Sequence, residues 1–260
     1  MSPAFHVGDR VLLAKYLKKL GTGLSEAYKK YGFKKIDLSF LTDSSSVFSS
    51  NIEGNRTDLN SFMNYKLNKA KIKITKEIKE IEDLVKAYGF AMKNDLNEKN
   101  LLKIHTVLSE KFVSKSRQGK YREESVGVYG KFGLVYLAAP PEVVEIEMKN
   151  LFEQIAILLK IKLSLEESFY FASQIHLSFA QIHPFVDGNG RAARLLEKWF
   201  LSKFLGEKAW KVASEKFYWE NRQEYYKNIN LGVNYYELDN LKSLPFLLML
   251  PKSLGGLTLN

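Results

Sequence analysis

One short segment combines residue types that could carry out chemistry on phosphate groups. Residues 183–194 read His-Pro-Phe-Val-Asp-Gly-Asn-Gly-Arg-Ala-Ala-Arg. Pro184 lacks a backbone N–H and the glycines favour turns, so the first half cannot be helical throughout. From Arg191 onward the residues favour a helix. The segment therefore predicts a tight loop that leads into a helix N-terminus, where backbone N–H groups and the helix dipole bind anions such as phosphate.

The polar groups of this segment each suit one part of that chemistry. The backbone N–H groups expected to face the anion belong to Gly188, Asn189 and Gly190. Asp187 is a hard oxygen ligand for Mg²⁺, and the charged forks of Arg191 and Arg194 match phosphate oxygens. His183 is the candidate general base, because an imidazole takes up a proton near neutral pH. The alternative is a glycine-rich helix cap with two surface arginines.

The same residues resemble the signature of the Fic family, His-x-Phe-x-[Asp/Glu]-Gly-Asn-Gly-Arg-x-x-Arg, and every fixed position is filled. The resemblance implies an ATP-dependent protein adenylyltransferase, which moves AMP onto a hydroxyl side chain of a target protein (AMPylation). It implies that His183 deprotonates this hydroxyl and that Asp187 holds Mg²⁺. The groups that it implies for binding the phosphates of ATP are Gly188, Asn189, Gly190, Arg191 and Arg194.

A second segment, residues 49–55, resembles the inhibitory motif of this family, [Ser/Thr]-x-x-x-Glu-[Gly/Asn]. Ser49 and Glu53 would lie on one face of a helix, and Gly54 suits the end of that helix. The resemblance implies that Glu53 pairs with Arg194 and withholds it from the γ-phosphate of ATP. Since the motif precedes the signature, it implies the class with an N-terminal inhibitory helix. The alternative is ordinary helix capping by a serine-rich loop with a surface glutamate.

Residues 125–136 break the otherwise helical pattern, because β-branched and aromatic residues alternate there with glycines. This composition predicts a β-hairpin. By the resemblance, its second strand is a flap whose edge pairs with a segment of the target protein. The flap residues are Gly133, Leu134, Val135 and Tyr136. The alternative is an incidental hairpin that covers the helices.

Other candidates are less specific. Tyr225 and Tyr226, with Asn230 and Asn234, fall where the resemblance implies contacts to adenine, and Tyr226 is the candidate for nucleotide binding. The tyrosine-to-asparagine spacing departs from the family pattern, and a tyrosine pair that packs a helix on the core is the alternative. The remaining histidines are interpreted as structural, since no metal-ligand pattern accompanies them. They are His6, His105 and His176.

The composition is that of a globular protein, with 45% hydrophobic and 26% charged residues over a length of 260. Because there are no cysteines and the first residues lack the apolar core of a signal peptide, we expect a cytoplasmic protein. The net charge of +10 invites a nucleic-acid or membrane partner. Lysines alternate with glutamates along helices, as in residues 76–83, so neither partner is predicted. A homo-oligomer stays open.

Apolar spacing and helix stops predict helices over residues 11–19, 24–31, 46–54, 74–92, 101–113 and 166–181, with a further helix from Glu142. The predicted fold is therefore all-α, a Fic-like helical core with one small β-hairpin flap. We divide the chain into an N-terminal helical region over residues 1–95, which carries the inhibitory motif, and a catalytic core with C-terminal helices over residues 96–260.

The sequence thus predicts an autoinhibited protein adenylyltransferase, with ATP as co-substrate, Mg²⁺ as cofactor and an unidentified target protein as partner. Transfer of another phosphate-containing group is an alternative, as is removal of AMP, because a glutamate can position water. A binding module without catalytic activity is a third interpretation, against which the intact His183 and Asp187 count.

Overall fold

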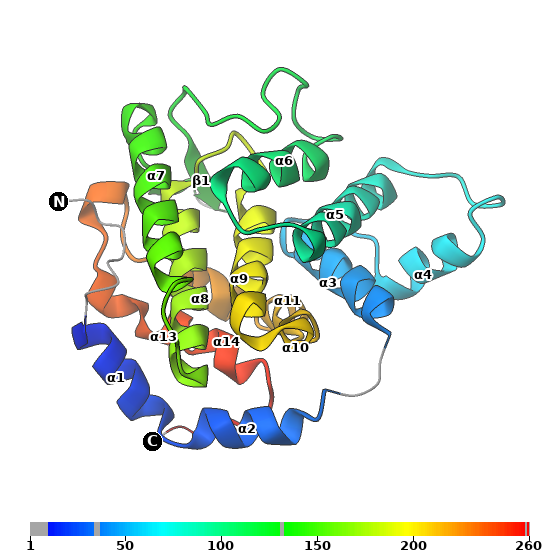
Figure 1. The fold of residues 1–260 in the computed structure, drawn as a ribbon. Coiled ribbons are helices and arrows are strands. Elements are labelled where there is room, and N and C mark those ends of the chain that lie inside the picture. The colour runs from blue at the N-terminus through cyan, green and yellow to red at the C-terminus, as the bar shows by residue number, and fades with distance from the viewer. Residues whose placement is uncertain (1–9, 34–36, 131–132, 258, 260) are drawn as a thin grey trace.

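The computed structural model describes residues 10–33, 37–130, 133–257 and 259, and helices make up most of them (Figure 1). The larger helices are α1 (Arg10–Leu20), α2 (Gly23–Tyr31), α3 (Leu38–Ile52), α4 (Leu59–Leu67), α5 (Lys76–Lys93), α6 (Glu98–Leu108), α7 (Pro141–Leu158), α8 (Leu165–Ile182), α9 (Asn189–Leu205), α11 (Ser214–Glu220) and α12 (Arg222–Ile229). The shorter ones are α10 (Glu207–Trp210), α13 (Leu244–Leu247), α14 (Met249–Lys252) and the 3₁₀ turns η1 (Tyr235–Glu237) and η2 (Asn240–Ser243).

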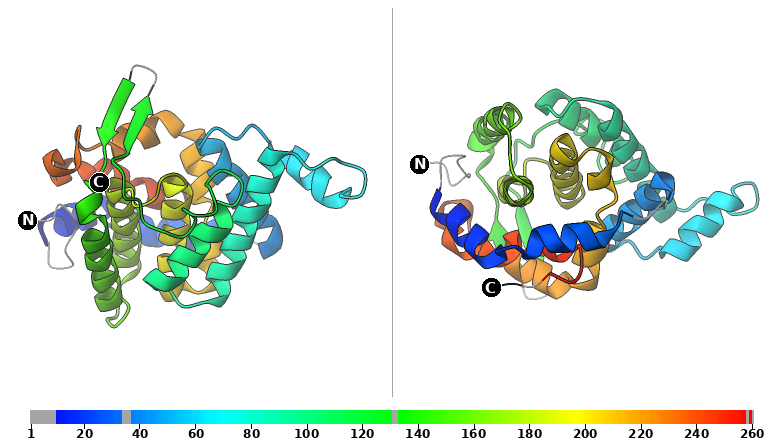
Figure 2. Two further views of the ribbon diagram at one scale, coloured as in Figure 1. Left: turned by 90° about the horizontal axis from the view of Figure 1, so that it is seen from above. Right: turned by 60° about the horizontal axis from the view of Figure 1, so that its bottom comes forward.

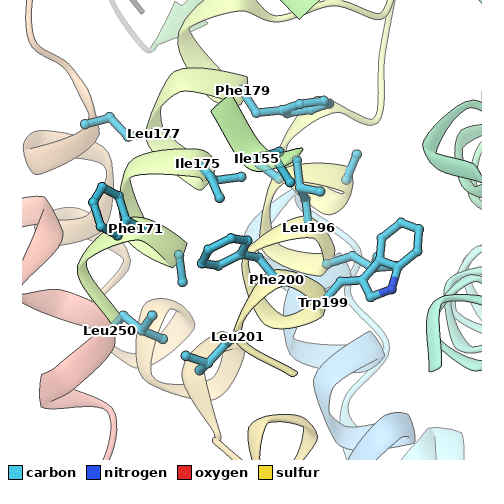
Figure 3. Packing of buried hydrophobic residues seen from close by; sticks show 14 of the residues in the cluster. Ile155, Phe171, Ile175, Leu177, Phe179, Leu196, Trp199, Phe200, Leu201 and Leu250 are labelled. Atoms are coloured by element: carbon cyan, nitrogen blue, oxygen red, sulfur yellow. The ribbon is translucent and has the colours of Figure 1, made fainter. Parts of the chain in front are cut away.

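The centre of the molecule is the pair α8 and α9, which frame the loop with the signature. Helix α8 begins at a capping box, in which the Ser164 hydroxyl accepts from the Glu167 N–H and the Glu167 carboxylate accepts from the Ser164 N–H. Apolar side chains one helical turn apart then form its contact face. Figure 3 shows Ile175 and Phe179 of α8 on the side of Leu196 and Phe200 of α9, whereas Phe171 lies on the other side of α8.

The other helices surround this pair. Helix α7 lies against α8, whereas α5, α6 and α3 lie against α9 (Figure 1). Helices α1 and α2 run along the base of the molecule with α13 and α14 (Figure 2, right). One continuous hydrophobic cluster includes Leu12 near one end of the chain and Leu250 near the other. It spans both sides of the predicted division at residue 95, and the division itself stays a prediction.

A single hairpin stands out from the helical body in the described part of the chain (Figure 2, left). Strand β1 (Gly127–Gly130) pairs antiparallel with β2 (Gly133–Leu137), with an irregularity between Val128 and Tyr129. The predicted all-α fold with one small hairpin is confirmed. None of the helices in the described ranges combines the length and apolar character needed to cross a bilayer.

Most predicted helices are confirmed, but two boundaries were wrong. Helix α3 begins eight residues before the predicted start at residue 46, because Asp37 caps it and the Thr42 and Ser46 hydroxyls bond to carbonyls one turn back. Helix α6 ends at Leu108 rather than at residue 113. The next residue, Ser109, caps the helix, and its hydroxyl donates to the His105 carbonyl. Serine and threonine favour turns in sequence statistics. Here, however, their hydroxyls donate hydrogen bonds to backbone carbonyls inside the helix or at its end.

The loop between α8 and α9 depends on backbone conformations that few residues adopt. His183, the last cap residue of α8, has φ +54°, and Gly188, the first cap residue of α9, has φ +85°. Helix α8 ends there because a residue before proline avoids the helical conformation. A Cβ on Gly188 would also lie 3.1 Å from Leu108 and 3.2 Å from Phe112.

We expect Gly188→Ala to lower the free energy of unfolding by about 1–3 kcal/mol, because alanine is strained at this φ and meets two side chains. Urea unfolding followed by circular dichroism measures the change. Gly89→Ala is the matched control: Gly89 lies inside α5 with no atom within 4 Å of the added Cβ, so a gain of about 0.5–1 kcal/mol is expected. Equal stability of the two variants would contradict the strain argument.

Candidate active site

The imidazole of His183 is oriented by the end of its own helix. Nδ1 lies 3.2 Å from the Ala180 carbonyl oxygen, which can only accept, so this contact assigns the proton to Nδ1. The lone pair of Nε2 is then left for a proton acceptor role. Burial lowers the pKa of His183 below its ordinary value, which keeps the ring neutral at neutral pH. His183 is thus a neutral base at the wall of a cavity.

Side chains, rather than a regular element, hold the loop that follows. The Asn189 amide accepts from the Phe185 N–H at 2.9 Å and donates to the Phe185 carbonyl at 2.8 Å. The His105 ring stacks on the Phe185 ring with centroids 3.6 Å apart. Its Nδ1 accepts from the Gly119 N–H, so Nε2 donates to the Asp187 carbonyl at 3.0 Å. Burial lowers the pKa of His105 to about 4, consistent with its predicted structural role.

Arg122 joins this loop to the base of the hairpin. Its guanidinium is 2% exposed and donates to the carbonyls of His183, Ile182, Glu124 and Ala139. Its backbone N–H donates to the Pro184 carbonyl at 2.9 Å. Since the carbonyls at a helix C-terminus lack partners within the helix, a cation there is favourable. Arg122 therefore fixes the end of α8, and with it the base, relative to the hairpin.

Asp187 directly precedes the glycine turn in the chain. Its side chain is 57% exposed, and its Oδ1 accepts from the Gly188 N–H at 2.5 Å and lies 3.4 Å from Arg191 Nη2. No group of three metal-ligating side chains occurs among the described residues. A single exposed carboxylate fits Mg²⁺ all the same, because this ion keeps several waters and binds through one or two carboxylates and substrate phosphates.

The two arginines of the signature point in different directions. The Arg191 guanidinium lies over the Phe112 ring, 3.6 Å from its centroid, and contacts Asp187 and Glu80 on the side of α5 and α6. Arg194 is completely buried on the side of α3. Its Nε donates to the Ser49 hydroxyl and its Nη2 to the Ser49 carbonyl, both at 2.9 Å. The sequence assigned phosphate binding to both arginines and did not predict that they point in different directions.

Glu53 completes the surroundings of Arg194. It is the last cap residue of α3, and Gly54 follows with φ +97°, so the helix ends where the sequence predicted. Glu53 Oε1 lies 2.7 Å from Arg194 Nη2, so the structure contains the ion pair that the resemblance implied. Burial by itself would raise the pKa of Glu53, but the guanidinium groups of Arg194 and Arg191 lower it below its ordinary value. The carboxylate is therefore ionised.

The Glu53 carboxylate also lies directly against the glycine turn. A Cβ on Gly190 would lie 2.1 Å from Glu53 Oε1 and 3.2 Å from Arg194 Nη1, so only glycine admits the carboxylate here. Gly190 is in the first turn of α9, where N–H groups lack acceptors within the helix and attract anions. Glu53 thus supplies a negative charge at the place where the sequence predicted phosphate.

A cavity of about 580 Å³ brings His183, Glu53 and Gly190 to one space. Its other lining residues are Val128, Tyr129, Gly130, Val135, Tyr136, Ala180, Gln181, Arg222, Tyr225, Tyr226, Ile229, Asn230, Leu231 and Leu238. The volume suits a small-molecule ligand. Of the adenine candidates, Tyr225, Tyr226 and Asn230 line the cavity, whereas the Asn234 side chain caps η1 instead. The Tyr226 hydroxyl donates to the Ile52 carbonyl at 2.8 Å and so connects α12 with the end of α3.

Of the four predicted flap residues, Val135 and Tyr136 line this cavity, whereas Gly133 and Leu134 are not among its lining residues. Leu134 and Val135 are 53% and 40% exposed, whereas Tyr136 is buried and its hydroxyl donates to the Gln181 carbonyl at 2.8 Å. At its end, β2 forms a bridge from Leu137 to Asn234. The strand is therefore anchored near its C-terminal end, in part to Gln181, two residues before His183, and exposes its first residues.

Comparisons with known proteins agree with this geometry. Residues 95–201 match the model of the Fic/DOC family. No curated protein sequence is significantly similar to the chain. The match to this family supports the transfer of a nucleotide-derived group to proteins in general.

Three solved structures have a similar fold. A Fic family protein from Desulfovibrio desulfuricans G20 is 21% identical with a TM-score of 0.76, and the match covers 98% of this chain and 74% of that one. A Fic domain containing signaling protein from Bacteroides thetaiotaomicron VPI-5482 is 20% identical with a TM-score of 0.64, covering 89% and 94%. Fic-1 from C. elegans is 20% identical with a TM-score of 0.63, covering 90% and 68%.

Sequence reasoning missed Arg122 and the environment of Tyr225, and it named His176 without a partner. A signal for Arg122 was present, because lysines supply most of the basic residues and each arginine is therefore unusual. No sequence signal linked His176 to Tyr225, since they come from different helices and meet only in the fold. His6 lies outside the described residues.

We expect Arg122→Met to lower the free energy of unfolding by about 3 kcal/mol, because it leaves several buried carbonyls without donors. Denaturant unfolding measures the loss. The control is Arg117→Met, which removes an arginine whose ion pair with Glu124 lies at the surface, with an expected change within about 0.5 kcal/mol. If both variants were equally stable, Arg122 would not hold the loop.

Proposed function

We propose that this protein is an adenylyltransferase that transfers AMP from ATP to a hydroxyl side chain of a target protein, and that Glu53 inhibits it in the resting state. The observation that carries the proposal is the meeting of His183, Glu53 and Gly190 in one cavity, with Glu53 paired to Arg194. A regulated phosphate transfer needs a base, a turn that binds anions, and an arginine that a carboxylate can withhold from the phosphate by pairing with it.

The proposed reaction is a displacement at the α-phosphorus of ATP. The target hydroxyl gives its proton to Nε2 of His183 while its oxygen forms a bond to phosphorus, and the bond to pyrophosphate breaks. The neutral ring and the Nδ1 contact to Ala180 support this role, because they leave Nε2 as the acceptor. The first-turn N–H groups of α9 would stabilise the phosphate charge.

Asp187 would hold Mg²⁺, which neutralises charge on the phosphates when it is bound. Arg191 lies 3.4 Å from the same carboxylate and would keep it directed at the turn. The exposed side chain of Asp187 supports this assignment, since the ion must reach both protein and nucleotide. Tyr226 would contact the nucleotide from the opposite wall of the cavity.

The flap, Gly133, Leu134, Val135 and Tyr136, would bind the target by adding one of its segments to the free edge of β2. Main-chain hydrogen bonds would then supply affinity, and the anchored Tyr136 would set the distance of the segment from His183. The exposure of Leu134 and Val135 supports this surface as the one that receives the target.

Inhibition would act on the γ-phosphate. In the resting state Ser49 and Glu53 occupy the donors of Arg194, and the Glu53 carboxylate repels an anion at Gly190. ATP would then bind without its γ-phosphate against Arg194, and its α-phosphorus would not face the target hydroxyl. This arrangement favours transfer of AMP over transfer of the γ-phosphoryl group, because the controlled arginine would hold the leaving pyrophosphate.

Glu53→Gly should raise labelling of the protein itself and of target bands in lysate by roughly ten- to thousandfold, because a partly buried ion pair is worth a few kcal/mol. Parallel reactions with ATP labelled at the α- or the γ-phosphate measure the rate and identify the group. Label from the α-position alone supports AMP transfer, whereas label from the γ-position would replace it with phosphorylation.

Glu110→Gly is the matched control, since Glu110 pairs with Lys111 at the surface and its replacement should leave labelling at background. Arg194→Ala should not reproduce the activation, because it removes the phosphate contact together with the inhibition. Background labelling by a folded Glu53→Gly protein that still binds ATP would refute the inhibitory role.

His183→Ala in the Glu53→Gly protein should lower transfer by a factor on the order of 10² or more while nucleotide binding persists. In the protein that retains His183, the rate should rise with pH through the lowered pKa of that base and stay flat above it. Loss of activity would therefore begin only below the ordinary histidine value of about 6.5. Rates of Glu53→Gly across this pH range check the profile, and an unchanged rate in His183→Ala would exclude His183 as the base.

A further inference from the structure

A buried chain of polar groups lies behind Arg194, on the side away from Glu53. Arg194 Nη1 lies 3.2 Å from the Tyr225 hydroxyl, which lies 3.0 Å from His176 Nε2. His176 Nδ1 lies 2.7 Å from Glu197 Oε2, and the Tyr218 hydroxyl donates to the same carboxylate at 2.9 Å. All of these residues are at most 2% exposed. They come from α8, α9, α11 and α12, so the fold alone assembles them.

The chemistry of the end groups fixes the direction of this chain. A guanidinium can only donate and a carboxylate can only accept. The Tyr225 hydroxyl therefore accepts from Arg194, which leaves its proton for His176 Nε2. His176 Nδ1 then donates to Glu197. With this assignment, each of the three contacts between Arg194 and Glu197 has one donor and one acceptor. No other assignment satisfies all three.

We propose that Tyr225, His176 and Glu197 are positioning residues that hold the Arg194 guanidinium in place for the γ-phosphate of ATP. The inference rests on the proposed function. Arg194 has two sets of partners. Ser49 and Glu53 belong to the resting state, whereas the Tyr225 side remains when Glu53 is displaced, so the arginine does not have to be oriented anew when the nucleotide binds.

The geometry supports a positioning role rather than packing alone. Tyr225 has its ring in the core, where Tyr218 and Phe246 contact it, and its hydroxyl accepts from Arg194 and donates to His176. A phenylalanine would satisfy the packing equally well. What it would lose is the acceptor for Arg194 and the donor for His176, in a place where water does not replace them.

The test measures ATP and ADP affinity in the Glu53→Gly protein by isothermal titration calorimetry with Mg²⁺ present. ADP lacks the γ-phosphate, so the ratio of the ADP to the ATP dissociation constant reports on Arg194 alone. Tyr225→Phe should lower this ratio about tenfold through a loss of ATP affinity, because a hydrogen bond to a charged group is lost. Glu197→Gln, which touches neither Arg194 nor the cavity, should lower it by a smaller factor in the same direction.

Tyr65→Phe is the matched control, since Tyr65 of α4 is also buried and its hydroxyl also donates a hydrogen bond, in this case to the carboxylate of Glu82 on α5. It should leave the ratio unchanged. A ratio that Tyr225→Phe does not alter would overturn the positioning role, and equal losses for ATP and ADP would reduce Tyr225 to a structural residue. If Glu53→Gly itself did not prefer ATP over ADP, the assignment of Arg194 to the γ-phosphate would fail first.

Discussion

The burial of one guanidinium organises the site. Arg194 is completely excluded from solvent, so its donors need acceptors and its charge needs a counter-charge within the protein. Ser49 and Glu53 from α3 and Tyr225 from α12 supply them. The hydrogen bonds and the ion pair of this one side chain therefore hold two segments, α12 and the end of α3, against α9. Arg194 is therefore suited to regulation, because an anion that binds to its guanidinium must displace one of the partners already bound there.

A second buried ion pair limits how that control can work. Lys198, one turn after Arg194 on α9, lies 2.6 Å from Glu215 on α11 and 2.9 Å from the Ser45 hydroxyl on α3. The Tyr88 hydroxyl of α5 donates to the same Glu215. Helix α3 is thus bound to the core along its length, and separation of the whole helix would expose this pair at considerable cost. Displacement of Glu53 at the end of the helix, beside the glycine at residue 54, is far less costly.

The base and the hairpin form a third unit. Arg122 joins the carbonyls at the end of α8 to those at the base of the hairpin, and the Tyr136 hydroxyl bonds to Gln181 two residues before the base. A target segment on β2 would therefore be placed against an element that shares its anchor with His183. Rigid mutual placement of a base and its substrate site is a large part of what catalysis of this type requires.

The sequence by itself determined the local chemistry. The signature loop, the helix that follows it, the end of α3 at Glu53 and the hairpin were all predicted, because turn residues and apolar spacing act over a few positions. Even the partner of Glu53 came from the motif rather than from spacing. Only the tertiary structure decided which way each arginine points, that Asn189 closes the loop with its side chain, and that Arg122 and Tyr225 contact the site. These depend on contacts between residues up to 145 positions apart, and the burial that gives such contacts their strength exists only in the folded chain.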